Sequence, residues 1–360
     1  LSLSSVEEIQ VQSGGFNAEY GNIRSGIVNI VTAEGPADHY SGSFYYQNSP
    51  AAPKNYGISP FDEDSYFMRP YLDDDVAWTG TGSGGWDAYT QDQYPGFEGW
   101  NSYNNPETGM TASAAQQEWI YEHRRTGKIT KPDQTLDLGF GGPIPGVAKL
   151  RFFLSIRSEE EQFIVPLSRD GYSSNSSRLK LNYDLSSNQK LIATMLYSEE
   201  HSVNQYNWTT VPEGNLLRGT YRVANLVTAT GLFTPAYYSP YSVFRGRFDV
   251  SYNHMLSSDS YFEIVFQHGQ TQYQTYQMDD RDTTKLEIFP DYFHDEAPYG
   301  YNSADWMSLG RDTSHTSSTL LKADYTDQIN SYNQIKMGVQ TNFYDLQIRS
   351  YTESDKDTWS

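Results

Sequence analysis

The side chains available for chemistry in this sequence are acidic, basic, histidine and hydroxyl groups, because its 360 residues include no cysteine. A thiol nucleophile, a thiolate zinc site and a disulfide framework are therefore excluded. The 7 histidines are scattered, and none forms a His-x-x-x-His pair. The glycine-rich run at 80–85 lacks the lysine and helix of a phosphate-binding loop, and no Ser–His–Asp order stands in a credible context. We predict no catalytic residue, no cofactor and no enzymatic activity.

Short acidic clusters carry the oxygen ligands that divalent cations prefer. They are residues 62–64, residues 73–75, and His294 with Asp291, Asp295 and Glu296. All of them lack the fixed spacing and the glycine of an EF-hand loop. We predict that none is a specific metal site.

Lysine and arginine side chains at alternate positions of strand-like segments are stronger candidates for a functional role. In residues 150–159, for example, Leu154 and Ile156 alternate with Ser155 and Arg157. This period of two places apolar side chains on one face of a strand and cations on the other. The cations on polar strand faces are Arg151, Arg157, Arg178, Lys180, Arg245, Arg247 and Lys322.

Two interpretations of these cations are open. Carboxylates on the same strand faces could neutralise them, and the candidates are Glu159, Asp184, Asp249 and Asp324. Alternatively, the cations form a basic wall that contacts another part of the protein or a ligand, because a charge taken out of bulk water needs a partner.

The same alternation predicts about nine strands that position these side chains. The segments are residues 40–47, 135–140, 150–159, 178–185, 190–201, 243–252, 261–276, 319–326 and 334–343. An aromatic content of 15% and a mean hydropathy of −0.67 agree with many strands joined by polar loops. No apolar run is long enough for a membrane-spanning helix, but a transmembrane strand needs only every second side chain to be apolar. The net charge of −20 argues against nucleic-acid binding.

Short and long connections alternate between the predicted strands. Tight turns rich in Gly, Pro, Asn, Asp or Ser lie at 140–150, 184–190, 253–260 and 327–333. The long connections are 49–132, 162–176, 205–240 and 278–314, and acidic residues concentrate in 49–132 and 278–314. Outer-membrane β-barrels alternate short turns and long loops in this way, whereas soluble sandwiches mix their loop lengths.

The first long connection contains signals of local order. Ser-Ala-Ala-Gln at 113–116 is a capping-box pattern and predicts a helix over 114–125. Aromatic side chains in this connection could stack on a ligand, but we expect them mainly to form a small core within the loop. These aromatic residues are Trp78, Trp86, Tyr89, Tyr94, Trp100 and Trp119.

A stretch near the N-terminus carries a family resemblance. Residues 6–32 read VEEIQVQSGGFNAEYGNIRSGIVNIVT, with strand-like runs at 6–12 and 27–32 around a glycine-rich turn that holds Phe16, Tyr20 and Arg24. This stretch resembles the C-terminal end of the plug domain in TonB-dependent outer-membrane receptors. The Asn-Ala-Glu-Tyr-Gly segment is similar to receptors of the Bacteroidota type, including the Oar-like group with a carboxypeptidase-regulatory-like N-terminal domain.

The resemblance implies an all-β fold, a transmembrane antiparallel β-barrel of about 22 strands with an internal plug domain. Residues 1–36 would be the C-terminal end of the plug and residues 37–360 the N-terminal part of the barrel. We expect the TonB box and most of the plug to lie upstream of residue 1. The plug residues expected at the basic wall are Glu7, Glu8, Glu19 and Arg24.

The function implied by the resemblance is import across the outer membrane of a Gram-negative cell. The ligand would be large or scarce, such as a peptide or protein fragment, a glycan or a metal chelate, and plug movement would be energised. The implied partners are outer-membrane lipids and lipopolysaccharide, the TonB energy-coupling complex and, as an open possibility, a surface lipoprotein. A non-transporting barrel that serves as a surface scaffold or adhesin is the alternative, and a soluble β-sandwich enzyme or lectin is a third hypothesis.

Overall fold

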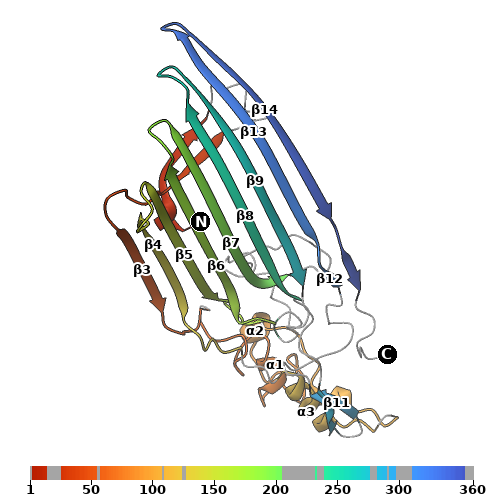
Figure 1. Ribbon diagram of the computed structural model, residues 1–360. Helices are drawn as coiled ribbons and strands as arrows, with labels where there is room; N and C mark the ends of the chain where they lie inside the picture. The colour runs from red at the N-terminus through yellow and green to blue at the C-terminus, as the bar shows by residue number, and fades with distance from the viewer. Residues whose placement is uncertain are drawn as a thin grey trace.

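The computed structural model describes residues 2–13, 26–54, 57–107, 109–123, 127–204, 232, 239–275, 282–289, 292–296 and 310–352. The main feature of this part of the chain is a 9-stranded antiparallel sheet with the order β14-β13-β9-β8-β7-β6-β5-β4-β3 (Figure 1). Its strands are β3 (Ser41–Ser49), β4 (Asp133–Pro143), β5 (Leu150–Gln162), β6 (Gly171–Asp184), β7 (Gln189–Asn204), β8 (Ser239–Met255), β9 (Ser260–Thr275), β13 (His315–Asn330) and β14 (Asn333–Gln347). Every predicted strand segment overlaps a strand of this sheet; residue 40 precedes β3, and residue 276 lies outside the described residues.

The two faces of the sheet differ in polarity. Leu154 on β5 lies opposite Phe140 and Leu179 on its neighbours, whereas Arg157 lies opposite Asp137. We call the face that carries Leu154 the outer face and the face that carries Arg157 the inner face. Large apolar side chains are exposed on the outer face, among them Phe44, Met195, Ile264, Leu321, Met337 and Phe343.

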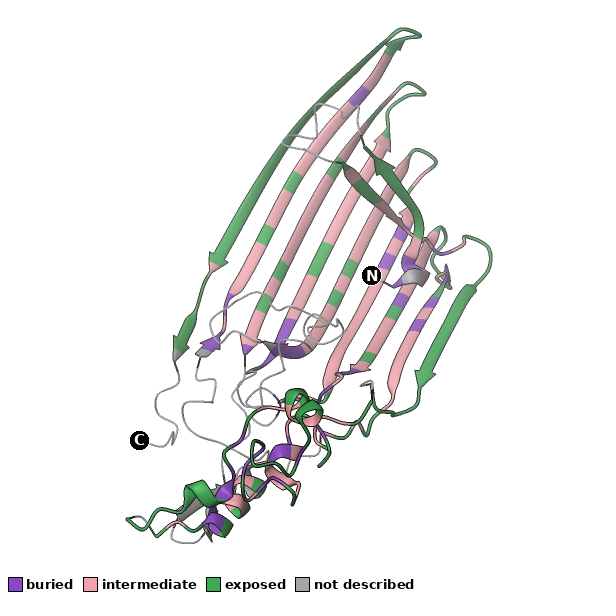
Figure 2. Cartoon of the chain, turned by 180° about the vertical axis from the view of Figure 1, so that it is seen from behind, coloured by how far each residue is buried: buried purple, intermediate pink, exposed green. Residues whose placement is uncertain are grey.

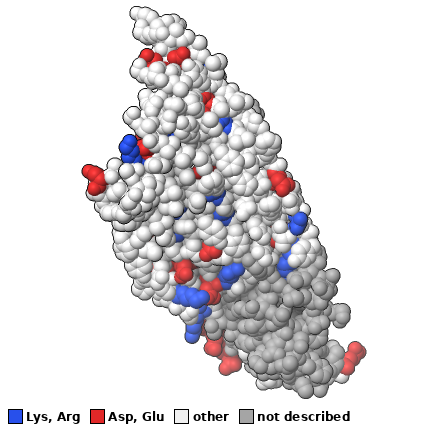
Figure 3. All heavy atoms as spheres, viewed as in Figure 1, with Lys and Arg blue, Asp and Glu red and all other residues white. Residues whose placement is uncertain are grey.

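An extended, exposed apolar face suits hydrocarbon and is unfavourable in water. On the side shown in Figure 3, charged atoms are scattered spots among uncharged ones. The β-sheet class expected from the sequence is confirmed for the described residues, which form mostly antiparallel strands with a few short helices. In the described residues, β3 and β14 are the two edges of an open sheet.

Short turns and long connections lie at opposite ends of the sheet. The turns between β4 and β5, β6 and β7, β8 and β9, and β13 and β14 are at the upper end in Figure 1, and the helices of the first long connection are at the lower end. The expected alternation therefore holds for the four tight turns and for the first long connection. No helix among the described residues has the length and apolar character needed to cross a membrane.

One predicted long connection is shorter than expected. Residues 162–176 were expected to form a loop, but β5 continues to Gln162 and β6 already begins at Gly171. The start of β6 is a polar run without alternation, so its sequence does not indicate a strand. Asn175 nevertheless pairs with Ser158 on one side and Glu199 on the other, and this backbone ladder extends the strand.

The other long connections lie mostly outside the described residues. Of the expected loop at 205–240, only Leu232 and the start of β8 are described. Within the expected loop at 278–314, β10 (Asp282–Phe289) pairs with β11 (Tyr292–Glu296) as an antiparallel hairpin. Further along, β12 (Gly310–Asp312) pairs with β15 (Ser350–Thr352). The sequence analysis missed these short pairings.

The first long connection is an ordered subdomain. It contains α1 (Arg69–Leu72), α2 (Ala88–Gln93), the 3₁₀ helix η2 (Trp100–Tyr103) and α3 (Ala112–Glu122). The helix expected at 114–125 is α3, but its N-cap is Thr111 and not Ser113. The Thr111 hydroxyl oxygen accepts the Ala114 N–H at 3.2 Å, so the helix begins earlier and Ser113 lies within its first turn.

Two apolar clusters stabilise this subdomain. The loop core consists of Ala77, Phe97, Trp100, Ala112 and Ala115, with Tyr71, Trp78, Met110 and Trp119 packed against it. The junction core consists of Met68, Phe163, Val165, Leu167, Val203 and Leu232. Because the junction core joins the subdomain to the β5–β6 connection and to the end of β7, the loop is fixed to the sheet.

The N-terminal residues form a separate small sheet. The 3₁₀ helix η1 (Leu3–Ser5) leads into β1 (Val6–Gln12), which pairs antiparallel with β2 (Ile27–Thr32). The strand runs predicted at 6–12 and 27–32 are therefore confirmed. This hairpin lies against one face of the large sheet, behind it in Figure 1 and in front of it in Figure 2.

Candidate functional site

The link between β2 and β3 meets the inner face at Glu34. Its carboxylate lies 3.2 Å from the Arg151 guanidinium on β5, 3.2 Å from Lys180 Nζ on β6 and 3.1 Å from Lys190 Nζ on β7. Arg151 also pairs with Asp184 at 3.0 Å. Burial alone would raise the pKa of Glu34, but hydrogen bonds and charge from Lys190 and Lys180 hold it below its ordinary value. We call these five residues the Glu34 cluster.

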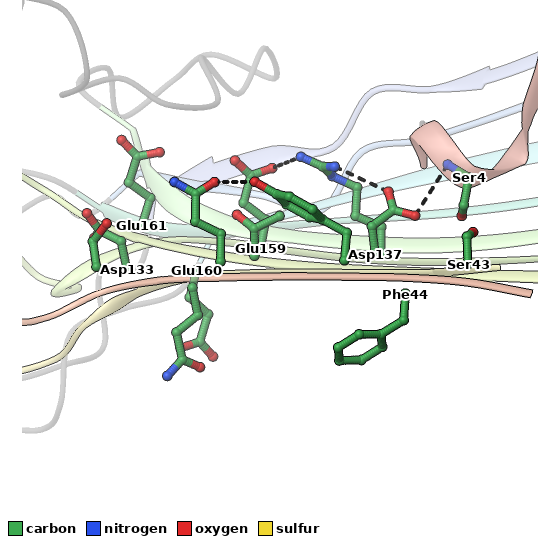
Figure 4. A pocket seen from close by; sticks show the side chains of 14 residues that line it. Ser4, Ser43, Phe44, Asp133, Asp137, Glu159, Glu160 and Glu161 are labelled. Atoms are coloured by element: carbon green, nitrogen blue, oxygen red, sulfur yellow. Dashed lines mark hydrogen bonds and ion pairs between the residues drawn. The ribbon is translucent and has the colours of Figure 1, made fainter.

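A second contact joins the N-terminal residues to β4 and β5. Asp137, only 4% exposed, accepts a hydrogen bond from Ser2 Oγ at 2.6 Å and one from the Ser4 N–H at 3.4 Å. Arg157 pairs with Asp137 and with Glu159, each at 3.3 Å. We call these residues the Asp137 cluster. Figure 4 shows Ser4, Asp137 and Glu159 on one side of the sheet and Phe44 on the other.

A cavity of about 660 Å³ adjoins the Asp137 cluster on the inner face. Its lining is mostly polar and acidic, and it includes Ser4, Ser43, Asp133, Asp137, Arg157, Glu159 and Glu161 (Figure 4). Lys54 pairs with Asp133 at 2.6 Å at the end of the sheet nearest the long loops. The hydroxyl, carboxylate and guanidinium groups of this lining could bind a polar ligand by hydrogen bonding.

The other inner-face cations have partners on the wall itself. Arg245 pairs with Glu200 at 3.2 Å, and Arg247 pairs with Asp249 at 2.8 Å. Lys322 pairs with Asp324 at 2.7 Å. In Arg178, by contrast, Nε and Nη1 are buried and make no hydrogen bond in the described structure.

Both interpretations of the basic wall therefore describe part of it. The same-face pairs considered in the sequence analysis are present for Arg151, Arg157, Arg247 and Lys322. The contact with the N-terminal segment is also present, but it is made through Arg151, Lys180 and Lys190 on one acidic residue.

The acidic residue at the wall is Glu34, which the sequence analysis missed. Glu7 and Glu8 on β1 are exposed, and Glu8 accepts a hydrogen bond from Gln10 at 3.1 Å. Glu19 and Arg24 lie outside the described residues. One feature of the sequence could have indicated Glu34: it lies in the link from β2 to β3, and this link has to run along the sheet to reach β3.

The loop aromatics divide into three groups. Trp100 is 3% exposed in the loop core, with Trp78 and Trp119 packed against that core. Trp86 and Tyr94 instead flank the Arg69 guanidinium, each at 5.1 Å. Tyr89 on α2 is 75% exposed and is the one aromatic of the predicted set that faces solvent freely.

The acidic clusters have structural partners in the described residues. Asp73 pairs with Arg69 at 3.1 Å and accepts a hydrogen bond from Trp86 Nε1 at 3.0 Å. The backbone N–H of Asp64 donates to Asp62 at 3.0 Å. The side chains around His294 lie outside the described residues. Within the described part of the chain, no group of three or more His, Asp or Glu side chains has the arrangement of a metal site.

Comparisons with known proteins give structural similarity alone. No family model and no curated protein matches the chain. A solved structure described as the RagAB peptide transporter is 10% identical with a TM-score of 0.41, and the match covers 93% of this chain and 39% of that one. A structure of the RagAB peptide importer in the closed-closed state is 13% identical with a TM-score of 0.37, covering 92% and 38%. The chain thus spans about two fifths of the length of these proteins.

Proposed function

We propose that this chain is part of an energised outer-membrane receptor that imports a large or scarce ligand. The observation that carries the proposal is the attachment of the N-terminal hairpin, through the Glu34 and Asp137 clusters, to the polar face of a sheet whose other face is apolar and exposed. An apolar outer face meets lipid in a barrel, and a polar inner face lines its lumen. A segment held on that inner face is placed to obstruct the lumen.

In this proposal, residues 1–36 are the end of a plug and residues 37–360 are barrel wall with extracellular loops. The resemblance of residues 6–32 to TonB-dependent receptors supports the assignment. The loops capture the ligand, and movement of the plug opens a path by a population shift without any covalent step. The ligand class is a peptide or protein fragment, a glycan or a metal chelate.

The proposed partners follow from the same resemblance. Outer-membrane lipids contact the outer face, and lipopolysaccharide contacts the acidic loops through loosely bound divalent cations. The TonB energy-coupling complex acts through a segment outside these residues. A surface lipoprotein is a further proposed partner at the loops.

The test is uptake by cells that contain or lack the full-length protein. Pools of fluorescein-labelled oligopeptides, labelled oligosaccharides and an iron chelate serve as the probes. The proposal expects uptake of one pool to need the protein and to stop when an uncoupler collapses the proton gradient. Unchanged uptake of every pool after deletion of the protein contradicts the transport function.

A surface scaffold or adhesin is the second candidate, and the ordered loop subdomain favours it. The loop and junction cores fix this subdomain to the sheet, so it presents a stable surface on which Tyr89 is exposed. For a scaffold, deletion of residues 57–123 abolishes attachment of a partner, while uptake of every probe stays at the level of cells without the protein.

A further inference from the structure

Glu34 is the point at which the N-terminal segment is most strongly held to the wall. Its carboxylate meets one cation from each of β5, β6 and β7. Arg151 on β5 lies 117 residues from Glu34 in the sequence, and Lys190 on β7 lies 156 residues from it. If the Glu34 carboxylate left the wall, Lys180 and Lys190 would stay packed there without this ion-pair partner. Separating a partly buried charge from its partners is much more costly than breaking an exposed pair.

The backbone around Glu34 is also fixed. Lys180 Nζ donates to the Thr32 carbonyl at 2.8 Å, and the Ala33 N–H donates to the Ser5 carbonyl at 2.9 Å. Gly35 lies so close to β5 that a Cβ at this position would overlap the Phe152 carbonyl oxygen. Residues 32–35 therefore lie directly on the wall, with room for glycine alone at position 35.

The second attachment is easier to break. Ser2 and Ser4 donate to Asp137 without bringing a charge of their own. When they leave, Asp137 keeps its ion pair with Arg157, and the freed hydroxyl and N–H groups can bind water. Beyond this contact the hairpin is exposed, with Ile9, Val11 and Val28 facing outward.

We propose that Glu34 is the anchor that keeps the C-terminal end of the plug on the barrel wall while the residues before it move. Residues 33–36 stay attached during transport, and the contact of Ser2 and Ser4 with Asp137 opens. Glu34 is a positioning residue in this scheme and does not contact the ligand. The inference rests on the proposed function, so its first test does not use transport.

The first test measures protease cleavage of the hairpin in the full-length protein in native membranes. Glu34→Gln keeps the size of the side chain and removes its charge. We expect cleavage of residues 2–32 to become about tenfold faster, because the segment opens from the wall more often. Glu8→Gln is the matched control, since it makes the same change at an exposed position of the same hairpin. Equal cleavage rates for Glu34→Gln and the unmodified protein overturn the anchor.

The second test locates the boundary between moving and fixed residues, and it uses the absence of native cysteine. A Cβ built at Gly139 lies 2.9 Å from Ser4 Cβ, so Ser4→Cys with Gly139→Cys places two thiols within reach of a disulfide. Oxidation should abolish uptake of the fluorescein-labelled oligopeptide pool, and reduction should restore it. Gly139→Cys alone controls for crowding at that position.

The companion pair is Glu34→Cys with Lys180→Cys. In the unmodified protein Lys180 Nζ lies 3.2 Å from the Glu34 carboxylate, so a short bis-maleimide between the two cysteines replaces this ion pair with a covalent link. We expect the linked protein to take up the peptide pool and to regain slow cleavage of the hairpin. Loss of uptake on linking would show that residues 33–36 move, which overturns the anchor. If the unmodified protein takes up no probe, the proposed function fails, and the cleavage rates still decide the anchor.

Discussion

Single residues on the inner face balance their charges in two ways. Arg157, Arg247 and Lys322 pair with a carboxylate two positions along the same strand, as the period of two allows. Such pairs could be predicted from the sequence, because both partners lie on the same side of one strand. The partnership of Arg151 with Glu34 spans 117 residues, and no local pattern indicates it.

Acid should weaken the Glu34 attachment. The folded-state pKa of Glu34 lies below its ordinary value of 4.5, so its contribution to stability is complete above pH 4.5 and is lost as the pH falls through the folded-state value. The charged groups that face Glu34 are Arg151, Lys180 and Lys190, and Asp184 faces Arg151.

Pepsin cleavage of the hairpin between pH 2 and pH 6 is the measurement for this prediction. At pH 6 the unmodified protein should be cleaved more slowly than Glu34→Gln, and the two rates should converge as the pH falls below the folded-state pKa of Glu34. A ratio that stays constant over the whole range would show that the Glu34 charge does not hold the segment.

At the scale of secondary-structure elements, the first long connection is a small folded unit. Tyr71 and Trp119 stack at 4.5 Å, and the Trp100 indole donates to the Tyr71 carbonyl at 2.8 Å. The aromatic composition predicted a core inside this loop, and the structure places Trp78, Trp100 and Trp119 at it. The cap at Thr111 and the junction to β7 depend on contacts that the sequence alone does not show.

Removing the central tryptophan should open this unit without unfolding the sheet. Trp100→Ala leaves a cavity in the loop core and costs about 3–5 kcal/mol of the free energy of local unfolding. Limited proteolysis of residues 57–123 measures the effect. Cleavage of these residues should become faster, while the protease resistance of the large sheet stays unchanged. Tyr89→Ala removes an exposed aromatic and should leave the cleavage rate as it was. Equal rates for the two variants would mean that the loop core does not stabilise the subdomain.

At the scale of the whole molecule, the large sheet has one exposed apolar face and one polar face. The strands present apolar outer-face side chains from β3 to β14, and the hairpin occupies the opposite side (Figure 2). In the proposed barrel, a charge on the outer face has to enter hydrocarbon, whereas a charge on the inner face has water and carboxylates nearby.

Neighbouring leucines on β13 test this division. Leu321 lies opposite Phe266 on the outer face, and Leu320 lies opposite Gln267 on the inner face. Leu321→Lys should lower the free energy of unfolding in lipid vesicles by about 2–4 kcal/mol, and Leu320→Lys by less than about 1 kcal/mol. Urea titration of the full-length protein in vesicles measures both. Equal losses of unfolding free energy for the two variants would show that the two faces have been assigned wrongly.

The sequence by itself determined the nine strands of the large sheet, their two faces and the positions of the four tight turns, because each follows from the local pleat and from turn residues. It also indicated which residues carry the inner-face cations. The tertiary structure alone decided that Glu34 meets Arg151, Lys180 and Lys190, that Ser2 and Ser4 meet Asp137, and that β6 begins at Gly171. These contacts join residues far apart in the chain, so they depend on how strands pair and how the N-terminal segment lies on the sheet, and no local pattern encodes either.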